Sequence, residues 1–237
     1  MLSGLLLNVA LYAVLRFKLL LAVNTEALAP GPMMIGMGLA SLLLAGFMLY
    51  RRRDIKRMFA YSSIEHMGIV TFAFGIGGPL ANFAGLMHMT MHSLTKSAIY
   101  FAVGYVAQAK GTQHMPSIRG LTASHPLLGW GLVFGVAPIV GLPPFGVFMS
   151  EFLIVTSTLP HEPGLAVVFV IGLLIAFGAL VMRMHGVAFG TPEGPNHPVR
   201  TIGLLPLFVH LLLVLAAGIY LPPPLVAWFQ AVARLLG

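Results

Sequence analysis

Long apolar runs divide the chain into segments of membrane-spanning length. A helix needs about 20 predominantly apolar residues to cross the hydrocarbon core of a bilayer. Seven stretches meet this requirement, namely 2–22, 32–50, 57–77, 81–107, 125–158, 164–184 and 202–221. The fifth is too long for one straight helix, and its Pro143 and Pro144 remove backbone donors. The pattern therefore predicts an all-α integral membrane protein with seven transmembrane helices, the fifth broken at Gly-Leu-Pro-Pro into half-helices at about 125–140 and 146–158.

The amino-acid composition agrees with a membrane location and argues against nucleic-acid binding and against cysteine-based redox or metal chemistry in this chain. The 237 residues are 58% hydrophobic and 8% charged, whereas a soluble domain carries roughly 25% charged residues. The net charge of +7 is therefore a property of the loops and does not indicate a nucleic-acid-binding surface. The absence of cysteine excludes disulfides, iron–sulfur ligands and thiolate metal sites. We expect no cofactor in this chain and place any redox chemistry in a partner.

The basic residues predict the orientation of the chain in the membrane. The connections after the second, fourth and sixth predicted helices carry nine of them: Arg51, Arg52, Arg53, Lys56, Arg57, Lys110, Arg119, Arg183 and Arg200. The opposite side has Arg16, Lys18 and Arg234. Because cytoplasmic loops are enriched in Lys and Arg, the N-terminus is expected in the cytoplasm and the C-terminus outside. The terminal stretch LVAWFQAVARLLG is amphipathic and suits the membrane interface.

The fourth predicted helix carries three titratable side chains in register. His88, His92 and Lys96 are spaced four residues apart and form a ladder roughly 12 Å long on one helix face. Each such residue costs about 2.5–3.5 kcal/mol on insertion scales, so function is the first hypothesis. A lone His more often packs against a neighbouring carbonyl, but three groups in register favour proton transfer. Two His at this spacing also resemble metal ligands; without a third ligand or a general-base Glu, no metal site is expected.

Four further intramembrane residues, with a neighbouring serine, are candidates. Glu151 follows the helix break with Ser150 beside it, and ion sites of transporters occur at such breaks, although Glu151 could instead cap the second half-helix. Glu65 and His66 are adjacent in the third predicted helix and could pair with a loop Arg or take up protons from the cytoplasm. Helical neighbours point about 100° apart, so one of these two, with His66 preferred, is expected to face the ladder. Asn8 could bond across a helix interface or assist the relay.

Three motifs together carry a family resemblance. They are 54-DIKRMFAYSSIEHMGIV-70, 88-HMTMHSLTKSAIYF-101 and 141-GLPPFGVFMSEFLIV-155. In this order and spacing they resemble the antiporter-like, proton-conducting membrane subunits of respiratory complex I, Mrp antiporters and group 4 membrane-bound NiFe-hydrogenases. The segment AYSSIEHMGI is most similar to component F of hydrogenase-4.

The resemblance implies roles for single residues. His66, His92 and Lys96 match proton-relay positions of the family, and Glu151 matches the acidic residue of its broken helix, on the exit route. Asn8 stands where complex I subunits usually have Lys or His, so it cannot titrate. The motifs correspond only to the second half of the family's fold. We therefore expect a truncated subunit, a mis-started subunit or one half of a split subunit; in the last case a separate chain supplies the N-terminal half.

The resemblance also implies an organisation and a function. Residues 1–237 form a single transmembrane domain, in which 32–184 are a complete five-helix repeat and 202–237 are the last helix and an amphipathic tail. The expected function is proton translocation in a hydrogenase-4, formate-hydrogenlyase or related NADH dehydrogenase-like complex, in the inner membrane of a bacterium or archaeon. The expected partners are other membrane subunits and the lipid bilayer, and nucleic acid is not expected as a partner. Catalysis of a chemical reaction is expected of the oxidoreductase partner and not of this chain. Alternatives are a complex I or Mrp-type Na⁺/H⁺ antiporter subunit and a non-conducting structural fragment.

Overall fold

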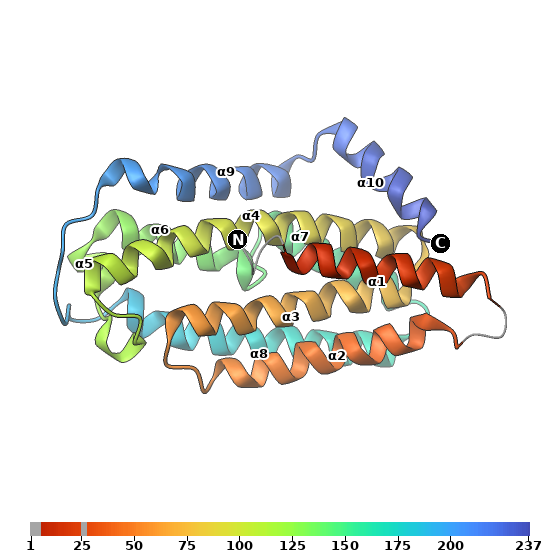
Figure 1. The fold of residues 1–237 in the computed structure, drawn as a ribbon, viewed down its shortest axis with the longest axis horizontal. Helices are drawn as coiled ribbons and strands as arrows, with labels where there is room; N and C mark the ends of the chain where they lie inside the picture. Colours follow the sequence, from red (N-terminus) through yellow and green to blue (C-terminus); the bar gives the residue numbers. More distant parts are fainter. Residues whose placement is uncertain (1–5, 25–27) are drawn as a thin grey trace.

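The structure, a computed structural model, describes residues 6–24 and 28–237, which fold into a bundle of α-helices. Most helices run roughly along the long axis of the molecule, and α10 lies at an angle near the C-terminus (Figure 1). The helices are α1 (Leu7–Ala22), α2 (Pro30–Leu49), α3 (Ile55–Ile76), α4 (Gly78–Lys110), α5 (Leu121–Ser124), α6 (Pro126–Ile139), α7 (Gly146–Thr158), α8 (Pro163–Ala188), α9 (Leu205–Ile219) and α10 (Pro223–Leu235). Two 3₁₀ turns, η2 (Met115–Ser117) and η3 (Thr201–Leu204), complete the described part.

The all-α class predicted from the sequence is confirmed. Three helical segments of the described residues are long and apolar enough to cross a membrane: Pro30–Leu49, Pro163–Ala188 and Thr201–Ile219. The shorter helices α6 and α7 are also apolar, while α3 and α4 carry the polar side chains of the site below. The count of seven crossings therefore stays a prediction. The first predicted segment began at residue 2, and residues 2–5 lie outside the described part.

A non-helical connection separates α6 from α7. Helix α6 ends at Ile139 and α7 begins at Gly146, with Pro143 and Pro144 between them. The chain turns at Gly141, whose φ of 68° lies in the left-handed region that favours glycine. Because two prolines lack backbone donors, the apolar segment 125–158 cannot continue as one helix. The connection instead folds back on the end of α6, where the Leu142 amide donates to the Ala137 carbonyl at 3.1 Å, and the following α7 packs against α4.

Helix α4 is the centre of the bundle. It packs against α3, α6, α7, α9 and α10, and α2 packs closely against α3. Glycines allow the α2–α3 approach: a Cβ placed on Gly68 would lie 2.7 Å from the Gly38 carbonyl oxygen. Small residues let helix backbones come together in this way in membranes. Helices α3, α4 and α7 thus bring their polar side chains to one interior region.

The three basic connections meet at one end of the bundle, beside α5 in Figure 1. The Met115 amide donates to the Arg53 carbonyl at 2.8 Å, which joins the α2–α3 connection to η2. The His197 amide donates to the Ala109 carbonyl at 2.8 Å, which ties the segment 189–200 to the end of α4. The three connections that were expected on one side of the membrane therefore lie at the same end of the bundle, and the cytoplasmic location of this end stays a prediction.

Candidate functional site

The polar residues expected to act together do converge inside the bundle. Their side chains come from three helices and are almost fully buried, with exposed fractions between 0 and 8%. The set comprises Glu65 and His66 from α3, His88, His92 and Lys96 from α4, and Ser150 and Glu151 from α7. Uncompensated burial of one such group is costly, and several of these side chains have a partner within the cluster.

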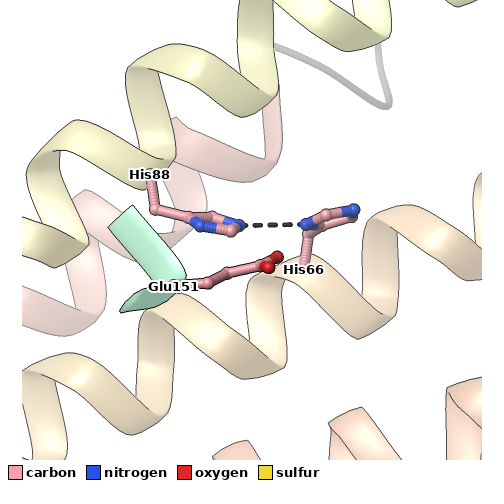
Figure 2. Close-up of side chains that lie close together, drawn as sticks. All are labelled: His66, His88 and Glu151. Carbon is pink, nitrogen blue, oxygen red and sulfur yellow. Dashed lines mark hydrogen bonds between the residues drawn. The ribbon is translucent and has the colours of Figure 1, made fainter. Parts of the chain in front are cut away.

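A short chain of hydrogen bonds links the three helices through His88. His66 Nδ1 lies 2.9 Å from His88 Nε2, and His88 Nδ1 lies 2.9 Å from Ser150 Oγ (Figure 2 shows the bond between the two rings). The Ser150 hydroxyl donates its single hydrogen to the Val147 carbonyl at 2.7 Å. His88 Nδ1 must then be the donor to Ser150, which leaves Nε2 as the acceptor for His66 Nδ1–H. The bond pattern thus assigns one tautomer to His88 and one to His66.

Glu151 completes this part of the site. Its carboxylate lies beneath the His66–His88 bond in Figure 2, and one ligand-type atom of each of the three residues lies within 4.8 Å of the others. Glu151 also touches the helix break, because a Cβ on Gly141 would overlap its Oε2 atom. The break therefore positions the carboxylate: Gly141 provides the turn and leaves space for the acid. The sequence placed Glu151 near the break but did not identify Gly141 as its neighbour.

The same three residues have the donor types of a metal site. Two imidazoles and one carboxylate are a ligand set found around zinc in proteins. The pair considered from the sequence was His88 and His92, whereas the structure brings His66, His88 and Glu151 together. In this arrangement a hydrogen bond of 2.9 Å joins His66 Nδ1 to His88 Nε2. A metal ion bound by both imidazoles would have to displace the proton of this bond.

His66 also joins the chain to Glu65 and His92. Its Nε2 atom lies 3.6 Å from Glu65 Oε2, and its ring centroid lies 5.1 Å from that of His92. Both ring nitrogens of His92 and the Oε2 atom of Glu65 are buried without a hydrogen-bond partner among the described residues. Such groups are uncommon inside proteins, and a catalytic role is one of the explanations for them. Both members of the Glu65–His66 pair are therefore buried, and His66, the one preferred from the sequence, bonds to His88 of the ladder.

Lys96 is anchored one turn beyond His92. Its Nζ donates to Ser62 Oγ at 2.8 Å and to the Phe59 carbonyl at 3.1 Å, and the side chain is fully buried. Ser62 lies about one helical turn before Glu65, so Lys96 reaches the face of α3 that carries Glu65. In the sequence, the one indication that Ser62 could bind Lys96 is its spacing of three residues from Glu65, which places both side chains on the same helix face.

Asn8 occupies a different position from the other candidates. Its amide donates to Ser93 Oγ at 2.6 Å and to the Met89 carbonyl at 3.3 Å, and so ties α1 to α4. Interhelical bonds of this kind stabilise helix pairs in membranes by about 1–2 kcal/mol in model peptides. The geometry of Asn8 fits the packing role that the sequence analysis considered for it.

Comparison with known proteins identifies the family. Residues 1–176 match the model of the NADH:quinone oxidoreductase/Mrp antiporter transmembrane family. The chain belongs to this family. The antiporter-family chain is 62% identical over 235 residues to a hydrogenase-4 component F homolog of Methylacidiphilum infernorum (isolate V4), covering 99% of the chain and 49% of that relative. It is 30% identical over 242 residues to NADH-quinone oxidoreductase subunit M of Escherichia coli (strain K12), covering 99% of the chain and 47% of that relative.

The fold of this antiporter-family chain is also found in a solved complex. A chain in the structure of the membrane-bound sulfane sulfur reductase, an archaeal respiratory membrane complex, superposes with a TM-score of 0.87 at 25% identity. The match covers 99% of this chain and 48% of that one. The antiporter-family chain thus spans about half the length of the curated relatives it matches. The family resemblance inferred from the three motifs is confirmed.

Proposed function

We propose that this chain carries protons across a membrane as one half of an antiporter-like subunit in a hydrogenase-4 or formate-hydrogenlyase-like complex. The observation that carries the proposal is the bonded sequence His66–His88–Ser150 with Glu151 beside it, buried where α3, α4 and α7 meet. Imidazoles in a hydrogen-bonded chain can accept a proton on one nitrogen and release one from the other. The relatives named above support the same assignment, since their names describe subunits of hydrogenase and NADH-quinone oxidoreductase complexes.

The proposed route alternates between α4 and α3 and ends on α7. Lys96, held by Ser62 one turn before Glu65, passes a proton to the Glu65 carboxylate, and Glu65 faces the unbonded Nε2 atom of His66 at 3.6 Å. A proton that arrives on this nitrogen releases the Nδ1 proton of His66 to His88 Nε2 at 2.9 Å. Glu151, within 4.8 Å of both rings, takes the proton from His88 after a small side-chain rotation and passes it toward the helix break.

His92 provides a side branch to this route. Its ring lies 5.1 Å from that of His66, and neither of its nitrogens has a hydrogen-bond partner in the described part of the chain. It can therefore exchange with His66 or with Lys96, one helical turn away. The proposal thus retains His66, His88, His92, Lys96 and Glu151 as the relay, with Glu65 and Ser150 as accessory groups.

The proposal includes a membrane topology. Seven segments cross the membrane, 32–184 form a five-helix repeat, and 202–237 form the last helix and an interfacial tail. The basic end faces the cytoplasm, so the N-terminus lies inside and the C-terminus outside. Because the chain has no cysteine, single cysteines at Thr191 and His161 can report their sides of the membrane. A membrane-impermeant maleimide applied from outside should label only His161→Cys, and the reverse labelling would refute the orientation.

The ligand types favour H⁺ over Na⁺. A Na⁺/H⁺ antiporter subunit of complex I or Mrp type is the nearest alternative. Hard cations bind oxygen ligands, whereas the centre of this site has two imidazoles and one carboxylate. A second alternative is a non-conducting structural fragment. In this proposal an oxidoreductase partner catalyses the redox reaction, and other membrane subunits complete the complex.

Proton flux into liposomes that contain the purified chain tests the proposal. The proton flux of wild type should exceed that of empty liposomes. Lys96→Ala and Glu151→Gln should each lower this flux roughly 100-fold or more, because one positioned proton-transfer group typically contributes about 10²–10⁴-fold. Exposed Lys56→Ala and Glu162→Gln make the same changes of charge outside the site and should leave the flux unchanged. Equal flux in all five proteins would refute the relay, wild-type flux no greater than that of empty liposomes would favour a structural fragment, and ²²Na⁺ uptake would favour the antiporter alternative.

A further inference from the structure

A pocket at the basic end of the bundle is lined by three arginines. Arg53 comes from the α2–α3 connection, Arg119 from the segment after η2, and Arg183 from the last turns of α8. The pocket has a volume of about 190 Å³, several times the roughly 30 Å³ that one water occupies in the liquid. None of the described residues that line it is acidic. Three guanidinium groups around one small space make a site for an anion with several oxygen acceptors.

The frame of the pocket is fixed by contacts between distant segments. The Met115 amide bonds to the Arg53 carbonyl at 2.8 Å, and the Ile118 amide bonds to the Met115 carbonyl at 3.0 Å. η2 in turn packs on α8, which brings the Arg183 turn against it. The three arginines therefore converge because of the tertiary structure, and their positions in the sequence, 66 and 64 residues apart, do not suggest a site.

The arginines are available to a ligand. The recorded ion pair of Arg119 joins it to Glu193 at 3.5 Å, with both side chains about half exposed. Exposed pairs of this kind contribute only about 0–1 kcal/mol, so an anion can displace Glu193. Gly186 lies on the pocket wall, and a Cβ placed there would meet nothing within 4 Å. The space in front of Gly186 is therefore open.

The position of α8 indicates where the anion comes from. With 26 residues and a rise of about 1.5 Å per residue, α8 is roughly 39 Å long, which exceeds the roughly 30 Å hydrocarbon core. Its last turns, which carry Arg183 and Gly186, therefore reach the depth of the lipid headgroups. Next to the pocket, Met182 is 69% exposed, and Leu174 two turns earlier is 62% exposed. This apolar surface continues from the pocket along α8 and fits an acyl chain.

We propose that the pocket formed by Arg53, Arg119 and Arg183 binds the phosphodiester headgroup of an anionic phospholipid, whose acyl chains lie along the exposed face of α8. Arginine suits this role because its planar fork of donors matches phosphate oxygens. Basic pockets between transmembrane helices on the cytoplasmic side recognise anionic headgroups by the same chemistry. The site is separate from the buried relay and does not depend on the proposed proton transport. Its chemical consequence is that lipid would hold the α2–α3 connection, η2 and α8 together.

Native mass spectrometry of the purified full chain can test the proposal. The chain would be exchanged into detergent with equal amounts of phosphatidylglycerol and phosphatidylcholine. Wild type should retain one phosphatidylglycerol in preference to phosphatidylcholine. Arg183→Gln removes a charged donor and Gly186→Leu fills the open space without changing charge, so each should lower retention roughly tenfold or more. Arg51→Gln makes the same change of charge on an exposed residue of the same end that does not line the pocket, and should retain the lipid like wild type.

The outcomes separate the pocket from general attraction to basic loops. Equal losses in Arg51→Gln and Arg183→Gln would overturn the proposal, as would equal retention of both lipids by wild type. Inorganic phosphate distinguishes the source of the anion: displacement of phosphatidylglycerol by millimolar phosphate would show a free-anion site and refute the lipid assignment. If Gly186→Leu fails to fold, Arg183→Gln, compared with Arg51→Gln by circular dichroism and lipid retention, still decides the question.

Discussion

Replacement of Ser150 by Ala would test the proton order inferred for the relay. The hydroxyl is fully buried, donates to the Val147 carbonyl at 2.7 Å and accepts from His88 Nδ1 at 2.9 Å. Alanine leaves His88 Nδ1–H without an acceptor, and a buried donor without a partner costs about 1–3 kcal/mol. At about 1.4 kcal/mol for each factor of ten, this lowers the population of the Nδ1–H tautomer about 5- to 150-fold. The other tautomer of His88 cannot accept the His66 proton, so flux should fall by a similar factor.

Two measurements check this prediction in the same sample. Proton flux into liposomes gives the transport rate, and solid-state ¹⁵N NMR of labelled histidine gives the tautomer of His88. Ser150→Thr keeps the hydroxyl and should restore both signals. Ser157→Ala is a matched control, because Ser157 lies on the same helix and its hydroxyl donates to the Ile154 carbonyl of its own helix at 2.9 Å. Wild-type flux together with an unchanged Nδ1–H tautomer in Ser150→Ala would refute the assigned order of donors.

Two glycine substitutions test the positioning of the site and the helix packing. Gly141→Ala should lower proton flux nearly as much as Glu151→Gln, because the added Cβ overlaps the Glu151 carboxylate and the φ of 68° disfavours alanine. Wild-type flux in Gly141→Ala would contradict the inference that the helix break positions Glu151. Gly68→Ala should destabilise the chain by about 1–3 kcal/mol through overpacking against Gly38, measured by thermal unfolding in detergent. Gly36→Ala, whose Cβ would enter open space on α2, should instead stabilise the chain by about 1 kcal/mol. Equal changes of unfolding temperature in Gly68→Ala and Gly36→Ala would contradict the packing explanation.

The sequence predicted the fold more completely than the contacts within it. Helices α2 and α8 follow from uninterrupted apolar runs, and the separation of α6 from α7 follows from Pro143 and Pro144, because these signals are local in the chain. Helix α4 extends to Lys110, beyond the predicted end at residue 107, because Gly111 in the left-handed conformation ends it. Local signals thus set where elements begin and end, within a few residues.

The candidate site shows what local signals leave out. The spacing of His88, His92 and Lys96 indicated one helix face, and all three are buried as expected. The spacing carried no information about which residues of α3 would meet this face, because that depends on the packing of two helices. The bond between His66 and His88 therefore appeared only in the structure, and so did the pocket lined by arginines from three separate segments.

The distances along α4 explain why a relay built on this helix needs a second one. His88 and Lys96 are eight residues apart, which is about 12 Å along the axis, whereas a hydrogen bond spans roughly 3 Å between its heavy atoms. His92 lies halfway, still about 6 Å from each along the axis. In the structure α3 lies beside this gap, with His66 bonded to His88 and with Lys96 bonded to Ser62, one turn before Glu65. Continuity of the proposed path therefore depends on the register between α3 and α4, and a shift of one turn, about 5.4 Å, would break it.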